Sequence, residues 1–222
     1  MKTFWHKYKH SLALLYFPVY LIWFIWLESR ADQPYHVIHM GLDDQIPFVE
    51  YFIVPYLLWF AYVAVVFIYL FFLNTKEFYR YCIFLFIGMT LFLVISTIYP
   101  NGHLLRPAAF ERENIFTLAV QLLYQTDTAT NIFPSIHVYN SIAAHMAVIH
   151  NQKLRENAWI RGGSLLLMIS IVLSTVFLKQ HSMLDLISGV GLGLIMNQLV
   201  YNTDYSFARE KRAQRKRKPA HT

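Results

Sequence analysis

The chain has 222 residues, of which 56% are hydrophobic and 14% are charged, and its formal net charge is +6. Soluble domains carry about 25% charged residues, and a soluble chain of this length has no interior large enough for so much apolar surface. The composition therefore predicts an integral membrane protein. The positive charge gathers at Lys2, Lys7 and Lys9 and in the segment 209–222. Beside membrane spans this is typical of a cytoplasmic or anionic lipid surface rather than of a nucleic-acid site.

Six apolar runs follow one another, and each is close to the roughly 20 residues that a helix needs to cross a bilayer. We expect spanning helices over residues 12–27, 49–73, 81–98, 136–149, 162–178 and 184–201. The first run could also be a signal peptide, but no small-x-small cleavage site follows it, and its aromatic content suits an anchor. Residues 114–124, in the longest connection, predict a short surface helix. The expected fold is all-α: a six-helix transmembrane bundle forming one domain over residues 1–208, followed by a basic cytoplasmic tail over residues 209–222.

The lysines and arginines divide unequally between alternate connections. The N-terminus, residues 74–80, residues 150–161 and the tail are rich in them. The opposite set of connections holds only four, namely Arg30, Arg106, Arg112 and Lys179. Cytoplasmic connections carry the excess of positive residues, so we expect both termini in the cytoplasm and a plasma-membrane location. Every candidate functional residue then lies at the outer face.

The segment STVFLKQHSMLD, residues 174–185, carries the strongest candidate chemistry. His181 and Asp185 are four residues apart, so they share one face of a helix. A carboxylate in that place fixes which imidazole nitrogen bears the proton and leaves the other free to attack. The plain alternative is an acid that caps a helix, but an ionised side chain in the first turn of a span is costly without a function.

A second segment, PSIH (residues 134–137), opens the fourth apolar run. Pro134 and Ser135 make a good helix start, where free backbone N–H groups attract an anion. His137 would lie one turn in and could protonate a leaving oxygen. Upstream, Arg106 is a cation of the kind that grips phosphate oxygens, although an Arg-Pro pair is as often an ordinary turn. Two further residues, Asp127 and Asn131, could contact a head group or only form turns and caps.

In this order, the segments resemble the type 2 phosphatidic acid phosphatase superfamily, which also includes vanadium haloperoxidases. The pattern of that family is Lys-x6-Arg-Pro, then Pro-Ser-x-His, then Ser-Arg-x5-His-x3-Asp. Here the three motifs read YPNGHLLRP, PSIH and STVFLKQHSMLD, within residues 99–190. The second and third are specific in combination, and the first is weak.

The resemblance implies a six-helix membrane enzyme with its site at the outer face. By matching positions, His181 would attack phosphorus and form a phosphohistidine, Asp185 would orient it, and His137 would be the general acid. Arg106 and the region of Ser135 would bind phosphate oxygens. The resemblance implies neither a metal nor another cofactor.

Two positions depart from the family pattern: Tyr99 stands where it has lysine, and Thr175 where it has arginine. Lys179, two residues before His181, could replace one of these cations as a point charge. A site with fewer cations suits a phosphodiester, which carries one negative charge, better than a monoester. The sequence thus leaves open a shift toward diester substrates.

Three functions follow from this pattern. The leading interpretation is an integral membrane phosphatase that acts on a phospholipid or isoprenoid-type lipid phosphate through a phosphohistidine. The alternative is a head-group phosphotransferase, similar to inositol phosphorylceramide synthase or sphingomyelin synthase. A third is a non-catalytic lipid-binding membrane protein, against which the intact His137, His181 and Asp185 argue.

Overall fold

A computed structural model describes residues 9–202 of the chain. Lys2, Lys7 and the basic tail expected over residues 209–222 lie outside the described residues. The described part is all-α, with eight α-helices, short 3₁₀ and π segments and two two-residue strands. The helical elements are η1 (Lys9–Leu15), α2 (Tyr16–Glu28), η2 (Glu50–Phe52), α3 (Ile53–Leu73), α4 (Thr75–Ile98), α5 (Ile115–Thr126), α6 (Ile136–His150), α7 (Gln152–Glu156), α8 (Ala158–Phe177), α9 (Met183–Asn197) and the π-helix η3 (Gln198–Asn202).

Five helical segments are long and apolar enough to cross a membrane, so the chain has the make-up of a multi-pass membrane protein. They are Lys9–Glu28, Glu50–Leu73, Thr75–Ile98, Ala158–Phe177 and Met183–Asn202. The fourth expected span, over residues 136–149, forms α6, which has 15 residues. At 1.5 Å per residue this helix is about 22 Å long, against a hydrocarbon core of about 30 Å.

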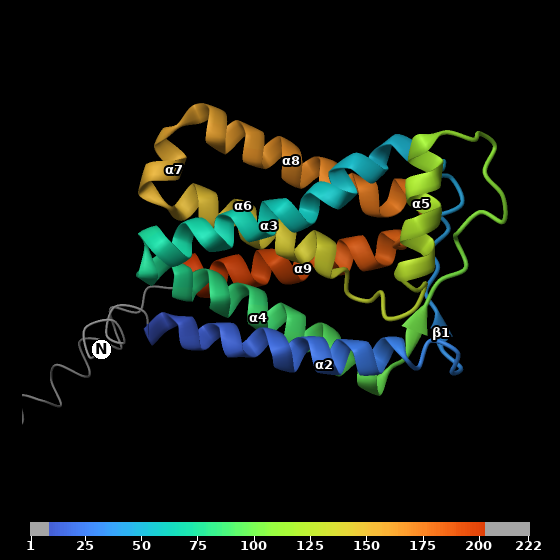
Figure 1. The fold of residues 1–222 in the computed structure, drawn as a ribbon, viewed down its shortest axis with the longest axis horizontal. Coiled ribbons are helices and arrows are strands. Elements are labelled where there is room, and N and C mark those ends of the chain that lie inside the picture. Colours follow the sequence, from blue (N-terminus) through green and yellow to red (C-terminus); the bar gives the residue numbers. More distant parts are fainter. Residues whose placement is uncertain (1–8, 203–222) are drawn as a thin grey trace, which may run out of the picture.

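The connections at one end of the bundle are shorter than the sequence predicts. Residues 74–80 were expected to be a loop, but α4 begins at Thr75 and the connection is Asn74 alone. The reason is a helix cap: the side chain of Asn74 accepts a hydrogen bond from the N–H of Glu77 at 3.2 Å, which lets the charged residues join the helix. Residues 150–161 likewise contain the helix α7. The short surface helix is confirmed as α5, which lies across the opposite end of the bundle (Figure 1).

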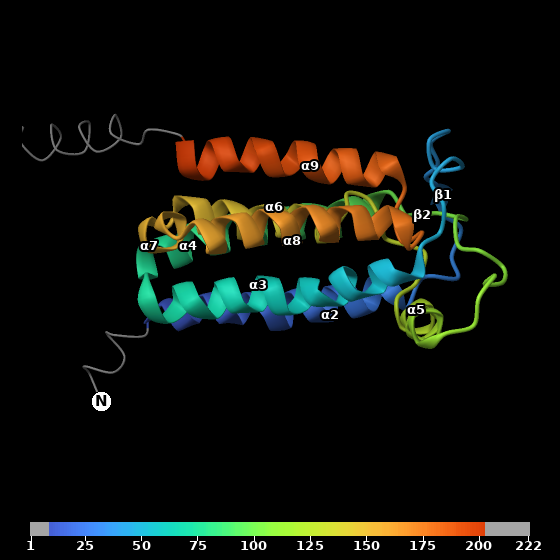
Figure 2. The same ribbon diagram turned by 90° about the horizontal axis from the view of Figure 1, so that it is seen from above.

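The helix α6 is the centre of the fold. It packs against α3, α4, α8 and α9, and Figure 2 shows it in a middle layer, with α9 on one side and α2 and α3 on the other. Its buried residues include Ala143, Ala144 and Ala147, whose small side chains let neighbouring helices come close. In this position the short helix is surrounded by neighbouring helices rather than by lipid.

Gly189 and Gly193 of α9 lie where this helix packs closely on α6, whereas Gly191 lies away from the contact. A Cβ on Gly189 would lie 2.9 Å from the carbonyl oxygen of Ser135, and one on Gly193 would lie 3.0 Å from the side chain of Ile142. Around Gly191, by contrast, a Cβ would meet no other atom within 4 Å. The lack of a side chain at Gly189 and Gly193 thus lets α9 pack against α6 at these two positions.

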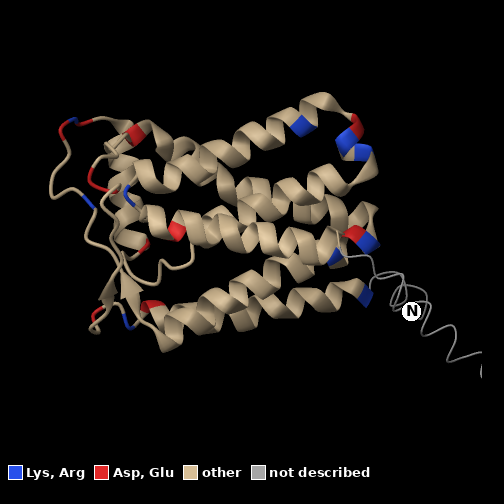
Figure 3. Ribbon diagram, turned by 180° about the vertical axis from the view of Figure 1, so that it is seen from behind, with Lys and Arg blue, Asp and Glu red and all other residues tan. Residues whose placement is uncertain are grey.

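Two short strands tie the loops together at the end where α5 lies. β1 (His36–Val37) pairs in parallel with β2 (Asn101–Gly102), with His36 opposite Asn101. The pairing fastens the connection between α2 and α3 to the connection between α4 and α5. Figure 3 shows mainly acidic residues at this end, with some lysines and arginines among them, and mainly lysines and arginines at the other end of the bundle.

Candidate active site

Two histidines and one aspartate from separate segments meet at the end of the bundle covered by α5. His181 lies between α8 and α9, Asp185 in the first turn of α9 and His137 in the first turn of α6. The Nε2 atom of His181 lies 3.4 Å from Nδ1 of His137. On the other side of the ring, Nδ1 of His181 lies 3.4 Å from Oδ2 of Asp185. The three residues that the sequence analysis assigned to one site therefore lie together, with His181 in the middle.

A capping box at the start of α9 fixes Asp185. The side-chain oxygen of Ser182 accepts a hydrogen bond from the N–H of Leu184 at 3.2 Å, and the N–H of Ser182 donates to Oδ2 of Asp185 at 2.9 Å. The other oxygen of Asp185, Oδ1, is buried and has no hydrogen-bond partner among the described residues. The carboxylate is thus held by the helix start and keeps unused acceptor capacity beside His181.

The backbone of Thr175 fixes the chain at His181. Its carbonyl oxygen accepts hydrogen bonds from the N–H groups of Gln180 and His181, at 2.9 and 3.0 Å. Burial lowers the pKa of His181 to about 3, so the imidazole is neutral. A proton on Nδ1, which faces Asp185, leaves the lone pair of Nε2 pointing toward His137. This is the state that a nitrogen nucleophile requires.

Ser135 joins the starts of α6 and α9. It is the N-cap of α6, and its side chain accepts a hydrogen bond from the N–H of Val138 at 3.4 Å. Its own N–H donates to the backbone oxygen of Asp185 at 3.3 Å. The carbonyl of Ser135 also lies against Gly189, so the backbone of Ser135 links the start of α6, with His137, to the start of α9, with Asp185.

Aromatic rings from α3 enclose His137. The ring centroid of His137 lies 4.7 Å from that of Tyr56 and 4.4 Å from that of Trp59. Rings at these distances restrict how the imidazole can rotate. The sequence analysis did not single out either ring, because an aromatic residue in an apolar span looks like any other packing residue.

Arg106 lies close to the site but is already engaged. It donates one hydrogen bond from Nη1, to the carbonyl of Tyr124, and three from Nη2, to the carbonyls of Asp127 and Thr128 and to Oε1 of Gln180. Its guanidinium carbon also lies 4.3 Å from the centre of the Tyr124 ring. The Nε atom is buried without a partner among the described residues. Arg106 therefore holds the segment after α5 in place, and its Nε–H remains available to a further acceptor.

Asp127 and Asn131 border the two histidines from the segment that leads to α6. Oδ2 of Asp127 accepts hydrogen bonds from Tyr56 at 3.1 Å and from the amide of Gln180 at 3.2 Å. Burial raises the pKa of Asp127 to about 6, against a smaller opposing effect of Arg106. Asn131 has a left-handed backbone with φ 55°, and its amide donates to Glu28 at 2.8 Å.

Comparison with known families places part of this chain in one of them. Residues 104–208 match the family model described as the PAP2 superfamily. The chain carries a PAP2 superfamily domain. That superfamily comprises phosphatases and phosphotransferases, so a phosphate ester is the substrate class it implies. No curated protein and no solved structure matches the chain.

The side chains at the two departures from the PAP2 pattern contact residues other than His137 and His181. The Tyr99 ring stacks on His36, with centroids 4.2 Å apart. Thr175 is buried, and its hydroxyl donates to the carbonyl of Val172 at 2.7 Å. The ammonium of Lys179 donates to the backbone oxygen of Asp43 at 2.7 Å, and burial lowers its pKa. The ammonium group of this lysine thus binds to the connection between α2 and α3.

Two cavities of the PAP2 domain and its neighbouring helices open on His137. A small chamber of about 40 Å³ is lined by both histidines together with Glu28, Asp127 and Gln180, among others. A mainly apolar cleft of about 610 Å³ lies between α2, α3 and α5. Both cavities are also lined by Asp127, Phe24 and Ile136. The two cavities therefore adjoin at these residues and at His137.

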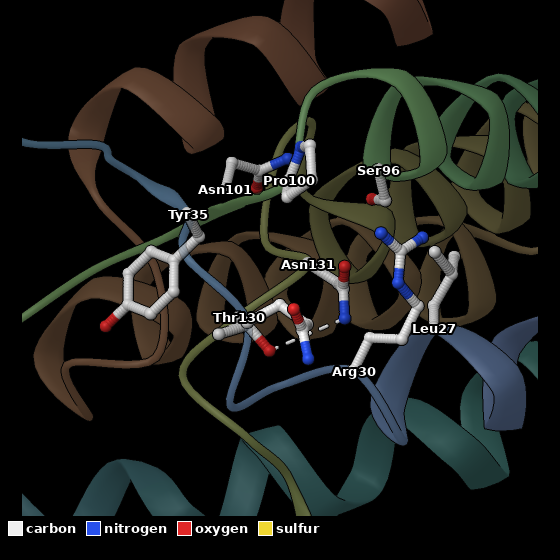
Figure 4. A pocket seen from close by; sticks show the side chains of 9 residues that line it. Leu27, Arg30, Tyr35, Ser96, Pro100, Asn101, Thr130 and Asn131 are labelled. Carbon is white, nitrogen blue, oxygen red and sulfur yellow. Dashed lines mark hydrogen bonds between the residues drawn. The ribbon is translucent and has the colours of Figure 1, made fainter.

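A third cavity backs onto the chamber without reaching the histidines. It has about 20 Å³, enough for roughly one water molecule. Thr130 and Asn131 line both spaces and form the wall between them. Figure 4 shows the side chain of Arg30 extending toward Ser96, whose buried hydroxyl has no partner among the described residues. Arg30 therefore lies behind the wall of the chamber.

Further residues of the site that the sequence does not single out are Glu28, Asp43 and Gln180. Glu28 accepts hydrogen bonds from Thr128 and Asn131 and lines the chamber. Asp43 contacts the start of α9. Glu28 and Asp43 precede the PAP2 match, and no spacing in the sequence links them to His181. Among residues 9–202, no group of three or more His, Cys, Asp or Glu side chains could hold a metal ion.

Proposed function

We propose that this PAP2 protein is a membrane-bound phosphatase that hydrolyses a lipid-linked phosphate through a phosphohistidine at His181. One observation supports this most directly: the buried, neutral ring of His181 lies between the carboxylate of Asp185 and the ring of His137, at 3.4 Å from each. Nucleophile, orienting acid and proton donor are thereby in reach of one phosphorus atom.

The reaction has two steps. In the first, Nε2 of His181 forms a bond to phosphorus while the bond to the alcohol oxygen breaks, and protonated His137 gives that oxygen its proton. The negative charge of the arriving phosphate favours the protonated form of His137. In the second, His137 accepts a proton from water as the water attacks phosphorus, and the bond to His181 breaks. Asp185 balances the positive charge on His181 between the steps.

Donors for the phosphate oxygens come from residues around the two rings. The free Nε–H of Arg106 and the backbone N–H groups at the start of α6, near Ser135, are the nearest candidates. Lys179 would contribute only if its ammonium left the carbonyl of Asp43. Asp127 and Asn131, at the wall of the chamber, would contact the head group.

The cleft between α2, α3 and α5 supports a lipid substrate. Its lining is mainly apolar, with Leu21, Phe60 and Leu122 among the residues that form it, and it leads to His137. A hydrocarbon chain in this cleft would leave the phosphate in the chamber. The volume of about 610 Å³ is within the usual range of pockets for small ligands.

We infer a six-span arrangement in which α6 crosses the membrane as a short helix surrounded by its neighbours. Both termini then face the cytoplasm, and the histidines lie near the outer face of the plasma membrane. Charge supports this orientation: six described lysines and arginines lie in α7 or in the first two turns of η1, α4 and α8, namely Lys9, Lys76, Arg80, Lys153, Arg155 and Arg161. Residues 1–208 would form one domain, with a basic tail over residues 209–222.

One observation favours a second candidate, the transfer of a phosphodiester head group. The chamber is lined by the carboxylates of Glu28 and Asp127, and none of its described lining residues is a lysine or arginine. Two acids repel a doubly charged monoester more strongly than a singly charged diester. A head group that bears hydroxyl or amino donors would also find acceptors in this wall.

The test is to incubate detergent-purified protein with matched lipid phosphomonoesters and phosphodiesters, with and without EDTA. Wild-type protein should release alcohol and form an acid-labile, base-stable phosphoprotein; His181→Ala should do neither. Retention of activity in folded His181→Ala would disprove the nucleophile assignment. Turnover of monoesters with release of inorganic phosphate supports the phosphatase, whereas turnover of diesters alone supports the transferase.

A further inference from the structure

We propose that Asp43, in the connection between α2 and α3, is a positioning residue that holds the start of α9 and so sets His181 and Asp185 in their working geometry. The proposal rests on the proposed function, because it concerns how that nucleophile is oriented. Asp43 lies outside the PAP2 match over residues 104–208. Its role therefore does not follow from the family motifs.

The carboxylate of Asp43 is built into the helix start. It is 2% exposed. Its Oδ2 accepts hydrogen bonds from the hydroxyl of Ser182 at 2.6 Å and from the N–H of Met40 at 2.8 Å. Its Oδ1 accepts from the N–H of Met183 at 2.7 Å. A buried carboxylate is costly unless it is well bonded, and here its bonds go both to its own loop and to α9.

These hydrogen bonds determine which groups donate and which accept in the capping box of α9. Because the hydroxyl of Ser182 donates its proton to Asp43, its lone pairs remain for the N–H of Leu184. The N–H of Ser182 is then directed to Asp185, whose carboxylate lies beside His181. Asp43, Ser182, Asp185 and His181 thus form one continuous chain of contacts. The negative charge of Asp43 at a helix N-terminus is also favourable in itself.

The same loop holds the chain on the other side of His181. Lys179 has a left-handed backbone, with φ 52°, which is uncommon for a residue with a side chain. Its ammonium donates to the backbone oxygen of Asp43. The loop around Asp43 therefore contacts residues 179, 182 and 183 and brackets His181. The pairing of β1 with β2 anchors this loop in turn.

The next residue in the chain provides a matched control. Asp44 has the same chemistry, but its side chain is 68% exposed, and the ion pair that it forms among the described residues is with His39, at 2.9 Å. Replacing either aspartate by asparagine removes the same charge from nearly the same place. Only Asp43 contacts α9, so only its loss should alter the geometry of His181.

The experiment measures kcat and KM of Asp43→Asn, Asp43→Ala and Asp44→Asn with the best substrate of the wild-type protein. We expect Asp43→Asn to lower kcat roughly 10- to 100-fold with KM changed less than threefold, because small displacements of a reacting group have effects of this size. Asn keeps one acceptor oxygen, so Asp43→Ala should lower kcat further than Asp43→Asn does. Asp44→Asn should match wild type. Folded Asp43→Asn with kcat within twofold of wild type would overturn the proposal.

Two further measurements test the proposal if Asp43→Ala folds poorly or if no good substrate has been found. Ser182→Ala removes only the 2.6 Å link, and the effects of Asp43→Asn and Ser182→Ala on kcat should be strongly non-additive. Purely additive effects would refute the path through Ser182. Independently of activity, the ring ¹⁵N resonances of His181 should shift in Asp43→Asn and not in Asp44→Asn; unchanged resonances contradict the proposal. Failure of wild type to form any phosphoprotein would instead count against the proposed function.

Discussion

At the scale of single residues, burial sets the chemistry of this site. His181 is buried, and the loss of solvent lowers its pKa to about 3 and keeps its nitrogen lone pair available at neutral pH. Burial raises the pKa of Asp127, the opposite of its effect on His181, because burial disfavours the charged form of either group. The site therefore holds a neutral base and an acid that titrates near neutral pH within one chamber.

The raised pKa of Asp127 predicts how stability depends on pH. The folded state holds this proton up to about pH 6, whereas the unfolded state releases it near pH 3.8. Stability from this group is thus complete below pH 4 and is lost as the pH rises through 6, by at most about 3 kcal/mol. Asp127→Asn keeps an oxygen for Tyr56 and Gln180 and removes the titration.

Thermal unfolding in detergent checks this expectation. The Asn variant should match wild type at pH 4 and melt several degrees higher at pH 7. Asp32→Asn, at an exposed position, should follow wild type throughout. A constant difference between Asp127→Asn and wild type across this pH range would show that Asp127 does not titrate there.

At the scale of elements, the sequence predicts helices well and their ends poorly. Apolar runs locate the spans, and α5 lies where its residues predict it. Runs alone place the start of α4 too late, because Asn74 caps a helix whose first turns are charged. The motifs bring His137, His181 and Asp185 together, but Asp43 and Asp44 are alike in sequence and differ only in what the folded loop brings against them. Contacts made by distant loops carry no local signal.

The contact between α6 and α9 makes a prediction about glycine. A methyl group on Gly189 would lie 2.9 Å from a backbone oxygen of Ser135, which cannot yield as a flexible side chain would. We expect Gly189→Ala to destabilise the protein by roughly 1–3 kcal/mol and to lower activity, because the backbone of Ser135 must shift. Gly191→Ala adds a methyl group where nothing lies within 4 Å, and it should be neutral or slightly stabilising.

Melting temperatures and activity of the two variants provide the comparison. The tight packing of α9 on α6 predicts a lower melting temperature for Gly189→Ala alone. Equal stability and activity of Gly189→Ala and Gly191→Ala would mean that the two helices are not packed closely at Ser135.

At the scale of the whole molecule, the two ends of the bundle differ in charge and in role. One end carries mainly lysines and arginines, and the other carries most of the acids (Figure 3). The two strands, α5 and the paired histidines lie at the acidic end. The helix α6 joins these ends through the centre, and its 15 residues carry His137 at one end and His150 at the other. Whether six or five segments cross the bilayer depends on this helix, so its crossing decides on which side each connection lies.

Two glutamines that flank α6 test the crossing. Gln125, near the end of α5, and Gln152, at the start of α7, are both exposed. In a background in which buried Cys82 is replaced by alanine, we expect Gln125→Cys to react with a membrane-impermeant maleimide in intact cells. Gln152→Cys should react only after permeabilisation, because positive connections stay in the cytoplasm. Equal labelling of both in intact cells would contradict the crossing of α6, and exchanged labelling would reverse the orientation and place the histidines at the cytoplasmic face.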